Sequence, residues 1–287
     1  MDGIIIIDKP QDWTSQDVTA KLRGVFQTRR IGHGGTLDPM ATGVLPVFVG
    51  RASRGVEFFE HADKVYETTL RLGLTTDTED TTGTILEEKP VCVTSADIEA
   101  VLPRFRGEIQ QIPPMYSAIK INGQKLVDLA RKGKEVERKS RTITIFALDF
   151  LGMTGNDARL RVHCSKGTYI RTLCKDIGAA LGCGGCMAEL RRTAAGSYTE
   201  AEAIPLSMLV DCDNPQQYLR PVDTLFTQYP AVTLTEKQAL RTRNGNSFSI
   251  HLEDGTYRAY DQTGEFLMLA KVDSGVMSTI KSFFHTN

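Results

Sequence analysis

The densest group of residues able to do chemistry lies in the loop RIGHGGTLDPMATGVLP, residues 30–46. A single carboxylate, Asp38, stands at its centre and precedes Pro39. The glycines allow left-handed or closely approached backbone, and Pro39 restricts Asp38 to extended geometry, so the carboxylate is held in one orientation. A carboxylate held in this way is a candidate for catalysis, and Asp38 is the first residue we expect to react.

The residue types of this loop leave three other interpretations open: a phosphate-cradling loop, a structural turn capped by Asp38, and a metal site with His33. A phosphate loop needs Gly-Lys-Ser/Thr at a helix start, which is absent, and a metal needs more ligands than His33 and Asp38. A structural turn is as compatible with these residues as catalysis is, because Gly and Asp are common in turns. A glycosidase with paired acids is disfavoured, since no second acid accompanies Asp38 in the motif.

The elements that must position this loop alternate between strands and helices. Apolar alternation predicts strands at residues 3–7, 44–49, 65–73, 142–150 and 160–164. Helical spacing predicts helices that begin near residues 14–15, 95 and 169 and end at glycines in the second and third cases. The strands at 142–150 and 160–164 flank an Asn-Asp turn, which indicates an antiparallel hairpin. We therefore expect an α+β fold with a mixed, largely antiparallel sheet flanked by helices.

The pattern changes after Pro205, and Tyr229-Pro230 introduces a compact run of short elements. We predict a catalytic domain at residues 1–228 and a second domain at residues 229–287. A short strand, a helix from Thr235 to about Asn244, and three strands separated by Asp-Gly and Thr-Gly turns fit a small β-barrel of about 60 residues.

Composition limits the class of protein. The chain has 287 residues with 41% apolar content, and its N-terminal apolar run is four residues long, too short for a signal peptide or a spanning helix. Six cysteines without a secretory signal favour reduced thiols and a cytoplasmic location. For Cys183-Gly-Gly-Cys186 we favour a structural turn over half a zinc site, because no second close pair supplies the remaining ligands.

The charges are unevenly distributed although the net charge is −1. Residues 119–144 and 159–195 are both basic, whereas residues 75–108 are acidic. Two basic segments can converge on a polyanion, but an ordinary solvated surface explains the charge alone equally well.

A resemblance to a known family decides between these alternatives. The motif GHGGTLDPMATGVLP resembles the signature of TruB-type tRNA pseudouridine synthases, whose Asp in the G-x-L-D-P core is catalytic. The segments DKPQDWTS, DKVYETTLRLGLTTDTEDTTG, FRGEIQQIPPMYSAIKINGQKLVDLAR, HCSKGTYIRTLCKDIGAALG and AELRRTAAG resemble further blocks of the family in the same order. The resemblance covers residues 3–197, and the tail after Tyr229 resembles, less specifically, the PUA-like RNA-binding domain of these enzymes.

The resemblance implies a pseudouridine synthase fold and a role for each matched residue. Asp38 would be the catalytic carboxylate, Tyr66 the aromatic that stacks on the target base and accepts the proton from C5, and Arg171 the partner that keeps Asp38 ionised. Tyr169 and Leu190 would complete the base pocket, and His33 and Lys9 would contact substrate. Residues 115–131 would form a mobile segment that closes over RNA.

The implied reaction is isomerisation of uridine 55 in the T loop of tRNA to pseudouridine, with the base flipped out of its stack. Nothing is oxidised or hydrolysed, so we expect no cofactor and no metal. The expected partner is tRNA, with no membrane and a monomeric enzyme. Two alternatives remain: a non-catalytic tRNA-binding protein or tRNA-folding chaperone, and a synthase that acts on ribosomal RNA or depends on a guide RNA.

Overall fold

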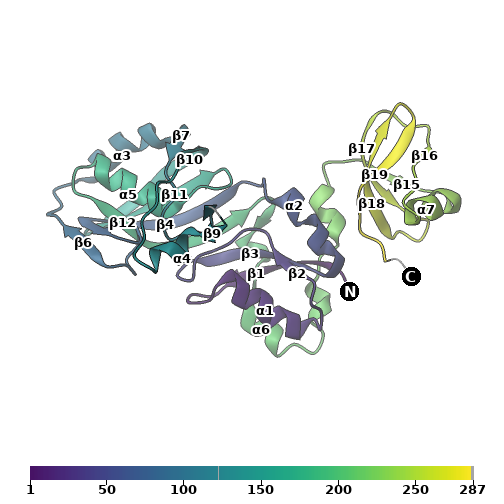
Figure 1. Ribbon diagram of the computed structural model, residues 1–287, viewed down its shortest axis with the longest axis horizontal. Coiled ribbons are helices and arrows are strands. Elements are labelled where there is room, and N and C mark those ends of the chain that lie inside the picture. Colours follow the sequence, from purple (N-terminus) through teal and green to yellow (C-terminus); the bar gives the residue numbers. More distant parts are fainter. Residues whose placement is uncertain (122, 286–287) are drawn as a thin grey trace.

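The computed structural model describes residues 1–121 and 123–285, and its main feature is a ten-stranded mixed sheet (Figure 1). Eight strands follow one another across it in the order β14 (Ile204–Pro205), β1 (Gly3–Lys9), β3 (Thr42–Val49), β12 (Gly185–Ala195), β4 (Lys64–Leu72), β11 (Asp157–Cys164), β10 (Arg141–Thr154) and β7 (Gly107–Gln111). The short strands β2 (Ile31–His33) and β13 (Tyr198–Thr199) pair with β3 and β12. Only the β1–β14 and β3–β12 pairs are parallel, which confirms the predicted mixed, largely antiparallel sheet.

Helices pack against this sheet along the apolar stripes that the sequence shows. In α1 (Ser15–Val25), Val18 and Leu22 are fully buried in the main core, and Thr14 caps the helix by a reciprocal bond with Asp17. In α5 (Ile170–Ala180), Leu173 and Ile177 join the same core. The remaining helices of this part are short: α2 (Val56–Phe59), α3 (Ser95–Val101), α4 (Leu126–Ala130) and α6 (Leu206–Val210). Two small hairpins, β5 (Leu74–Thr76) with β6 (Ile85–Glu88) and β8 (Lys120–Ile121) with β9 (Gln124–Lys125), lie outside the main sheet.

The sequence did not predict β12, although this strand lies at the centre of the sheet between β3 and β4. Its segment GCMAELRRTAA carries three charged residues, and one of them, Arg192, is only 1% exposed. A buried arginine breaks the alternation by which strands are recognised. The chain turns at Leu181–Cys183 just before the strand, with Gly182 and Gly184 at positive φ, so Cys183 of the predicted turn lies in it while Cys186 already belongs to β12.

The pairing of β3 with β12, in the middle of the sheet, is short. Only two residue pairs join these strands, Thr42 with Arg191 and Gly43 with Arg192. Gly43 has φ +99°, and a Cβ there would lie 2.2 Å from the Arg192 carbonyl oxygen, so only glycine allows the two backbones to approach. The loop that carries Asp38 ends at this junction, which places the carboxylate between the two halves of the sheet.

A second, five-stranded sheet follows at the C-terminus, at one end of the elongated molecule (Figure 1). It runs in the order β15 (Ala231–Thr233), β17 (Gly255–Tyr260), β18 (Phe266–Asp273), β19 (Val276–Ser282) and β16 (Phe248–Ser249), with α7 (Glu236–Arg243) packed on its own small core. The helix lies where the sequence predicted it, and the predicted Thr263-Gly264 turn lies between β17 and β18. At the predicted Asp254-Gly255 turn the chain only bends before β17, and the turn between β18 and β19 is at Ser274-Gly275. The domain boundary at residue 228 stays a prediction, because Phe226 packs with Leu269 and Phe283 across it.

No helix among the described residues is long and apolar enough to cross a membrane.

Candidate active site

A cavity of about 310 Å³ opens beside the loop of residues 34–38. Five of the seven predicted site residues line it, although they come from four separate parts of the chain: Asp38, Tyr66, Tyr169, Arg171 and Leu190. The loop before β3, strand β4, the start of α5 and strand β12 each contribute. The fold therefore brings together residues that lie as far as 150 positions apart in the sequence.

Asp38 and Arg171 form an ion pair in this cavity, with Arg171 Nη2 2.9 Å from Asp38 Oδ2. The Arg171 side chain is 6% exposed, whereas Asp38 is 37% exposed and opens toward the cavity. Burial raises the pKa of Asp38 above its usual range, Arg171 lowers it, and the nearby Asp80 raises it further. Arg171 thus acts in the expected direction, but it offsets only part of the effect of burial.

The Arg171 guanidinium is fixed on its other sides as well. Nη1 donates to the Thr78 carbonyl at 3.3 Å, and Nη2 donates to the Tyr116 carbonyl at 2.9 Å. The carboxylate of Asp80 lies 3.9 Å from Nη1 and is itself 5% exposed. Sequence analysis missed Asp80, because an acidic residue in the TTDTEDTTG segment reads as part of a solvated acidic face.

The preceding residue, Glu79, ties this loop to α5. Its carboxylate accepts a hydrogen bond of 2.6 Å from Thr172 and pairs with Lys175 at 2.5 Å. Glu79 has φ +65°, a conformation that costs a non-glycine residue of order 1 kcal/mol. The two α5 contacts offset that strain and hold the Asp80 loop against the helix that carries Arg171.

Tyr66 and Leu190 are diagonal neighbours on the adjacent strands β4 and β12. Tyr66 lies on β4 opposite Arg192 of β12, and Leu190 lies opposite Thr68. Both side chains are mostly buried, at 9% and 8% exposed, and both line the cavity. Burial raises the pKa of Tyr66, so its phenol is neutral near pH 7. A neutral aromatic ring beside an aliphatic side chain forms a slot suited to a planar base.

Tyr169 is held by a residue that sequence analysis also missed. The Gln111 side chain donates to the Tyr169 carbonyl at 3.0 Å and accepts from the Tyr169 amide at 2.8 Å. Gln111 ends the edge strand β7 and is only 2% exposed. This two-point contact fixes the residue that precedes α5 and therefore the direction from which Arg171 enters the cavity.

The other two predicted substrate contacts, His33 and Lys9, do not line the cavity. Lys9 is fully buried, and its ammonium donates to the carbonyls of Pro10, Trp13 and Pro39. That Lys9 binds substrate stays a prediction, and in the structure its three bonds position the Asp38-Pro39 turn. His33 ends β2, its Nδ1 has no partner among the described residues, and burial lowers its pKa.

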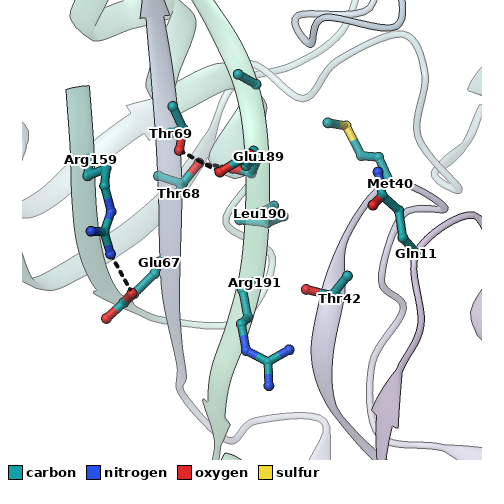
Figure 2. Close-up of a pocket in the computed structure, with 11 residues that line it drawn as sticks. Gln11, Met40, Thr42, Glu67, Thr68, Thr69, Arg159, Glu189, Leu190 and Arg191 are labelled. Carbon is teal, nitrogen blue, oxygen red and sulfur yellow. Dashed lines mark hydrogen bonds and ion pairs between the residues drawn. The ribbon is translucent and has the colours of Figure 1, made fainter. Parts of the chain in front are cut away.

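The two basic segments differ in the structure. In residues 159–195 most cations are paired internally: Arg159 and Arg161 with Glu67, Lys175 with Glu79, and Arg191 with Asp8 and Glu200. Figure 2 shows Arg159, Glu67 and Arg191 of this set around a second pocket. Side chains alternate along a strand, so Glu67 and Thr69 of β4 point to the face of the sheet opposite Tyr66. In residues 119–144 the bases are exposed apart from Arg138, which pairs with Glu135.

Comparison with known proteins agrees with this geometry. The profile of the TruB family pseudouridylate synthase N-terminal domain matches residues 23–170, and that of the tRNA pseudouridylate synthase B C-terminal domain matches residues 171–227. The chain is 45% identical over 280 residues to tRNA pseudouridine synthase B of Pseudomonas fluorescens (strain Pf0-1), which covers 94% of this chain and 91% of that protein. Its identity to the protein of the same name from Clostridium kluyveri is 42% over 273 residues, covering 93% and 94%.

Two solved structures resemble this chain over nearly its whole length. A chain of a Cbf5-Nop10-Gar1 complex superposes with a TM-score of 0.74 at 27% identity, covering 98% of this chain and 85% of that one. An H/ACA RNP bound to a substrate RNA that contains 2'-deoxyuridine gives a TM-score of 0.73 at 25% identity, covering 99% and 85%. With two matching domain profiles and relatives above 40% identity over most of its length, the chain belongs to the TruB family of pseudouridylate synthases.

Proposed function

We propose that this pseudouridine synthase converts the T-loop uridine of tRNA, uridine 55, to pseudouridine, with Asp38 as its essential carboxylate. The observation that carries the proposal is the Asp38–Arg171 ion pair in one cavity with Tyr66 and Leu190. The relatives named tRNA pseudouridine synthase B support tRNA as the substrate.

The reaction breaks the N1–C1′ bond, turns the detached uracil, and joins C5 to the same sugar carbon. The base must leave its stack and remain trapped, and unstacking costs a few kcal/mol. The slot between Tyr66 and Leu190 holds the ring, while Asp38 faces the sugar and Tyr169 closes one side. Tyr66 takes up the C5 proton at the end of the reaction and gives up its own hydroxyl proton in exchange, because its phenol starts neutral; N1 of the ring gains a proton, so none is left over.

Contacts to RNA phosphates offset the cost of unstacking. The exposed bases of residues 119–144 are suited to this because few carboxylates compete for them: Lys120, Lys125, Arg131, Lys132, Lys134, Lys139 and Arg141. Ser117 and Ala118, at the start of the segment proposed to close over RNA, line the cavity itself. His33, beside the same loop, contacts the T loop where the target nucleotide is displaced.

The C-terminal sheet adds a PUA-like surface for the same RNA. We infer that one chain suffices for activity, because a single chain supplies the Asp38–Arg171 pair together with Tyr66 and Leu190, and we propose that the enzyme is a monomer.

The test is Asp38→Asn with an unmodified tRNA transcript. Pseudouridine formation should be abolished while tRNA affinity stays within about an order of magnitude, because charge is removed and shape is kept. Asp149→Asn, an exposed aspartate of β10, is the matched control and should react normally. Carbodiimide derivatisation and mass mapping identify the modified uridine.

Each outcome bears on a different part of the proposal. Normal turnover by Asp38→Asn contradicts the role of the carboxylate. Modification at another uridine contradicts the T-loop assignment. Tight tRNA binding without turnover by the unmutated protein supports the alternative of a non-catalytic tRNA-binding or tRNA-folding protein.

A further inference from the structure

Arg192 is a buried cation without a counter-ion. Its side chain is 1% exposed, and Nε and Nη2 donate to the carbonyls of Val44 at 2.6 Å and Gly35 at 3.2 Å. A side-chain hydrogen bond from Arg192 also lowers the pKa of Tyr66, and no carboxylate of residues 1–121 and 123–285 lies within 4.0 Å of the guanidinium. Arg192 nevertheless lines the catalytic cavity.

Lys64 is a second buried cation that forms no ion pair among the described residues. It begins β4, is 8% exposed, and lines the same cavity, where its ammonium donates to the Ala62 carbonyl. A Cβ built on Gly35 would lie 3.6 Å from Arg192 Nη1 and 3.9 Å from Lys64 Cε, so both side chains flank one point of the catalytic loop. Burial lowers the pKa of Lys64, and the nearby charge of Arg192 lowers it further.

Two cations buried side by side are unfavourable when no carboxylate among the described residues lies within 4.0 Å of either, although Asp63 partly offsets the effect at Lys64. Desolvation penalises each of them and their mutual repulsion adds to the penalty. Arg171, in the same cavity, shows the usual solution, because the carboxylates of Asp38 and Asp80 lie on either side of it. The unpaired charge at Arg192 and Lys64 therefore points to an anion that enters the cavity.

The depth of the site in the cavity decides whether this anion is an RNA phosphate or the base. An RNA phosphate next to the flipped nucleotide stays near the cavity mouth, because the chain has to enter and leave there. Arg192 lies at the inner side, opposite Tyr66 in the β4–β12 register. The group that reaches this depth beside Tyr66 is the base.

We propose that Arg192, with Lys64 beside it, forms an anion site that stabilises the negatively charged uracil released from the sugar. This inference rests on the proposed function. When the N1–C1′ bond breaks, its electron pair stays on N1, and the ring carries one negative charge shared by N1, O2 and O4. C5 then returns an electron pair to C1′, the C5 proton leaves, and N1 gains a proton, so the product is an isomer of the substrate.

The site serves the reaction because the charge exists only after the bond has begun to break. A donor fixed in advance toward a charge that develops in the transition state lowers the barrier without tightening substrate binding. The bonds to Val44 and Gly35 hold the guanidinium in place for this purpose. A purely structural Arg192 would use the same two bonds, so the test must separate the two roles.

The test compares two bases in the same T-stem-loop RNA, uridine and 5-fluorouridine. Fluorine withdraws electrons and stabilises the anionic ring, so a defect in anion stabilisation should shrink with this substrate. The readout is the single-turnover rate of N1–C1′ cleavage, followed as loss of the N-linked nucleoside, because a fluorinated C5 has no proton to lose. For Arg192→Gln we expect about a 100-fold loss with uridine and about a 10-fold loss with 5-fluorouridine, at unchanged RNA affinity.

A charge-conserving variant, a control variant and a fallback variant complete the design. Arg192→Lys keeps the charge and should recover part of the rate. Arg191→Gln is the matched control, because its side chain pairs with Asp8 and Glu200 and points into the second pocket of Figure 2, so it should react like the unmutated protein. If Arg192→Gln fails to fold, Lys64→Gln is measured in its place and should show the same dependence on the base.

Equal losses with both bases in a folded variant would overturn the anion site and leave Arg192 a structural role. Weaker RNA binding at an unchanged rate would overturn it in favour of a phosphate site. A failure of the proposed function is distinct from both, since the unmutated protein would then make no pseudouridine in tRNA.

Discussion

Arg171 touches Asp38 at 2.9 Å and approaches the carboxylate of Asp80 at 3.9 Å from the other side, so one guanidinium bridges two acids. The bridge affects the charge of Asp38, the proposed catalytic carboxylate, as well as its position. Arg171 lowers the pKa of Asp38, while burial and Asp80 raise it.

Arg171→Gln tests this balance through the pH profile. The acid limb of kcat/KM should lie above the usual range of an aspartate, because only ionised Asp38 reacts and its pKa is raised. Without the guanidinium the pKa rises further, so the limb moves to higher pH and kcat falls. Asp80→Asn removes a charge that raises the pKa and should move the limb the other way; a shared direction in both variants would contradict this account.

Tyr66→Phe separates stacking from proton transfer. The ring that packs beside Leu190 is kept, so tRNA affinity should be unchanged. The hydroxyl that accepts the C5 proton is lost, so the final step should slow by about 10²-fold or more. Measuring kcat with C5-deuterated uridine checks the assignment, because an isotope effect should emerge in the variant. Unaltered kcat without an isotope effect would exclude Tyr66 as the base.

The sequence predicted well those elements whose pattern is local. The strands at β1, β3 and β4 and the helix α5 follow from apolar periodicity, and Asp38 follows from a Gly-rich loop closed by Pro39. The positions of Asp80 and Gln111 do not follow, because their partners Arg171 and Tyr169 lie 91 and 58 residues away. Their functions exist only in the folded chain.

Charged residues in the interior account for the other differences. Arg192 concealed the central strand β12, since a buried arginine looks like a surface residue in a sequence. Lys9 was expected to contact substrate from the family resemblance, and nothing in the sequence indicated that its ammonium donates to three backbone carbonyls inside the protein. In both cases the residue type alone does not indicate that the side chain is buried.

Lys9→Met should destabilise the fold more than it alters RNA affinity. The carbonyls of Pro10, Trp13 and Pro39 would lose their donor inside the protein, and a buried unsatisfied group costs about 1–3 kcal/mol. Urea unfolding should therefore show a loss of about 3 kcal/mol or more in the free energy of unfolding. Lys21→Met, an exposed lysine of α1, is the control and should unfold normally. A stable Lys9→Met protein with weakened tRNA binding would contradict the structural role and support the predicted contact of Lys9 with substrate.

The junction between the two sheets depends on a small aromatic cluster. Phe226 is 1% exposed, and its ring lies 5.8 Å from that of Phe283, while Tyr260 donates to Asp223 at 2.6 Å beside it. Removing a buried phenylalanine costs about 3–5 kcal/mol, so Phe226→Ala should release the C-terminal sheet from the catalytic part.

Calorimetry should then resolve two unfolding transitions, and limited proteolysis should cut near residues 228–230. Leu240→Ala, on the exposed side of α7, should leave both measurements unchanged. If Phe226→Ala lowers the stability but unfolds in a single transition without cleavage at the junction, the two sheets form one cooperative unit, because neither would then hold its core without the other. That result would contradict the predicted division at residue 228.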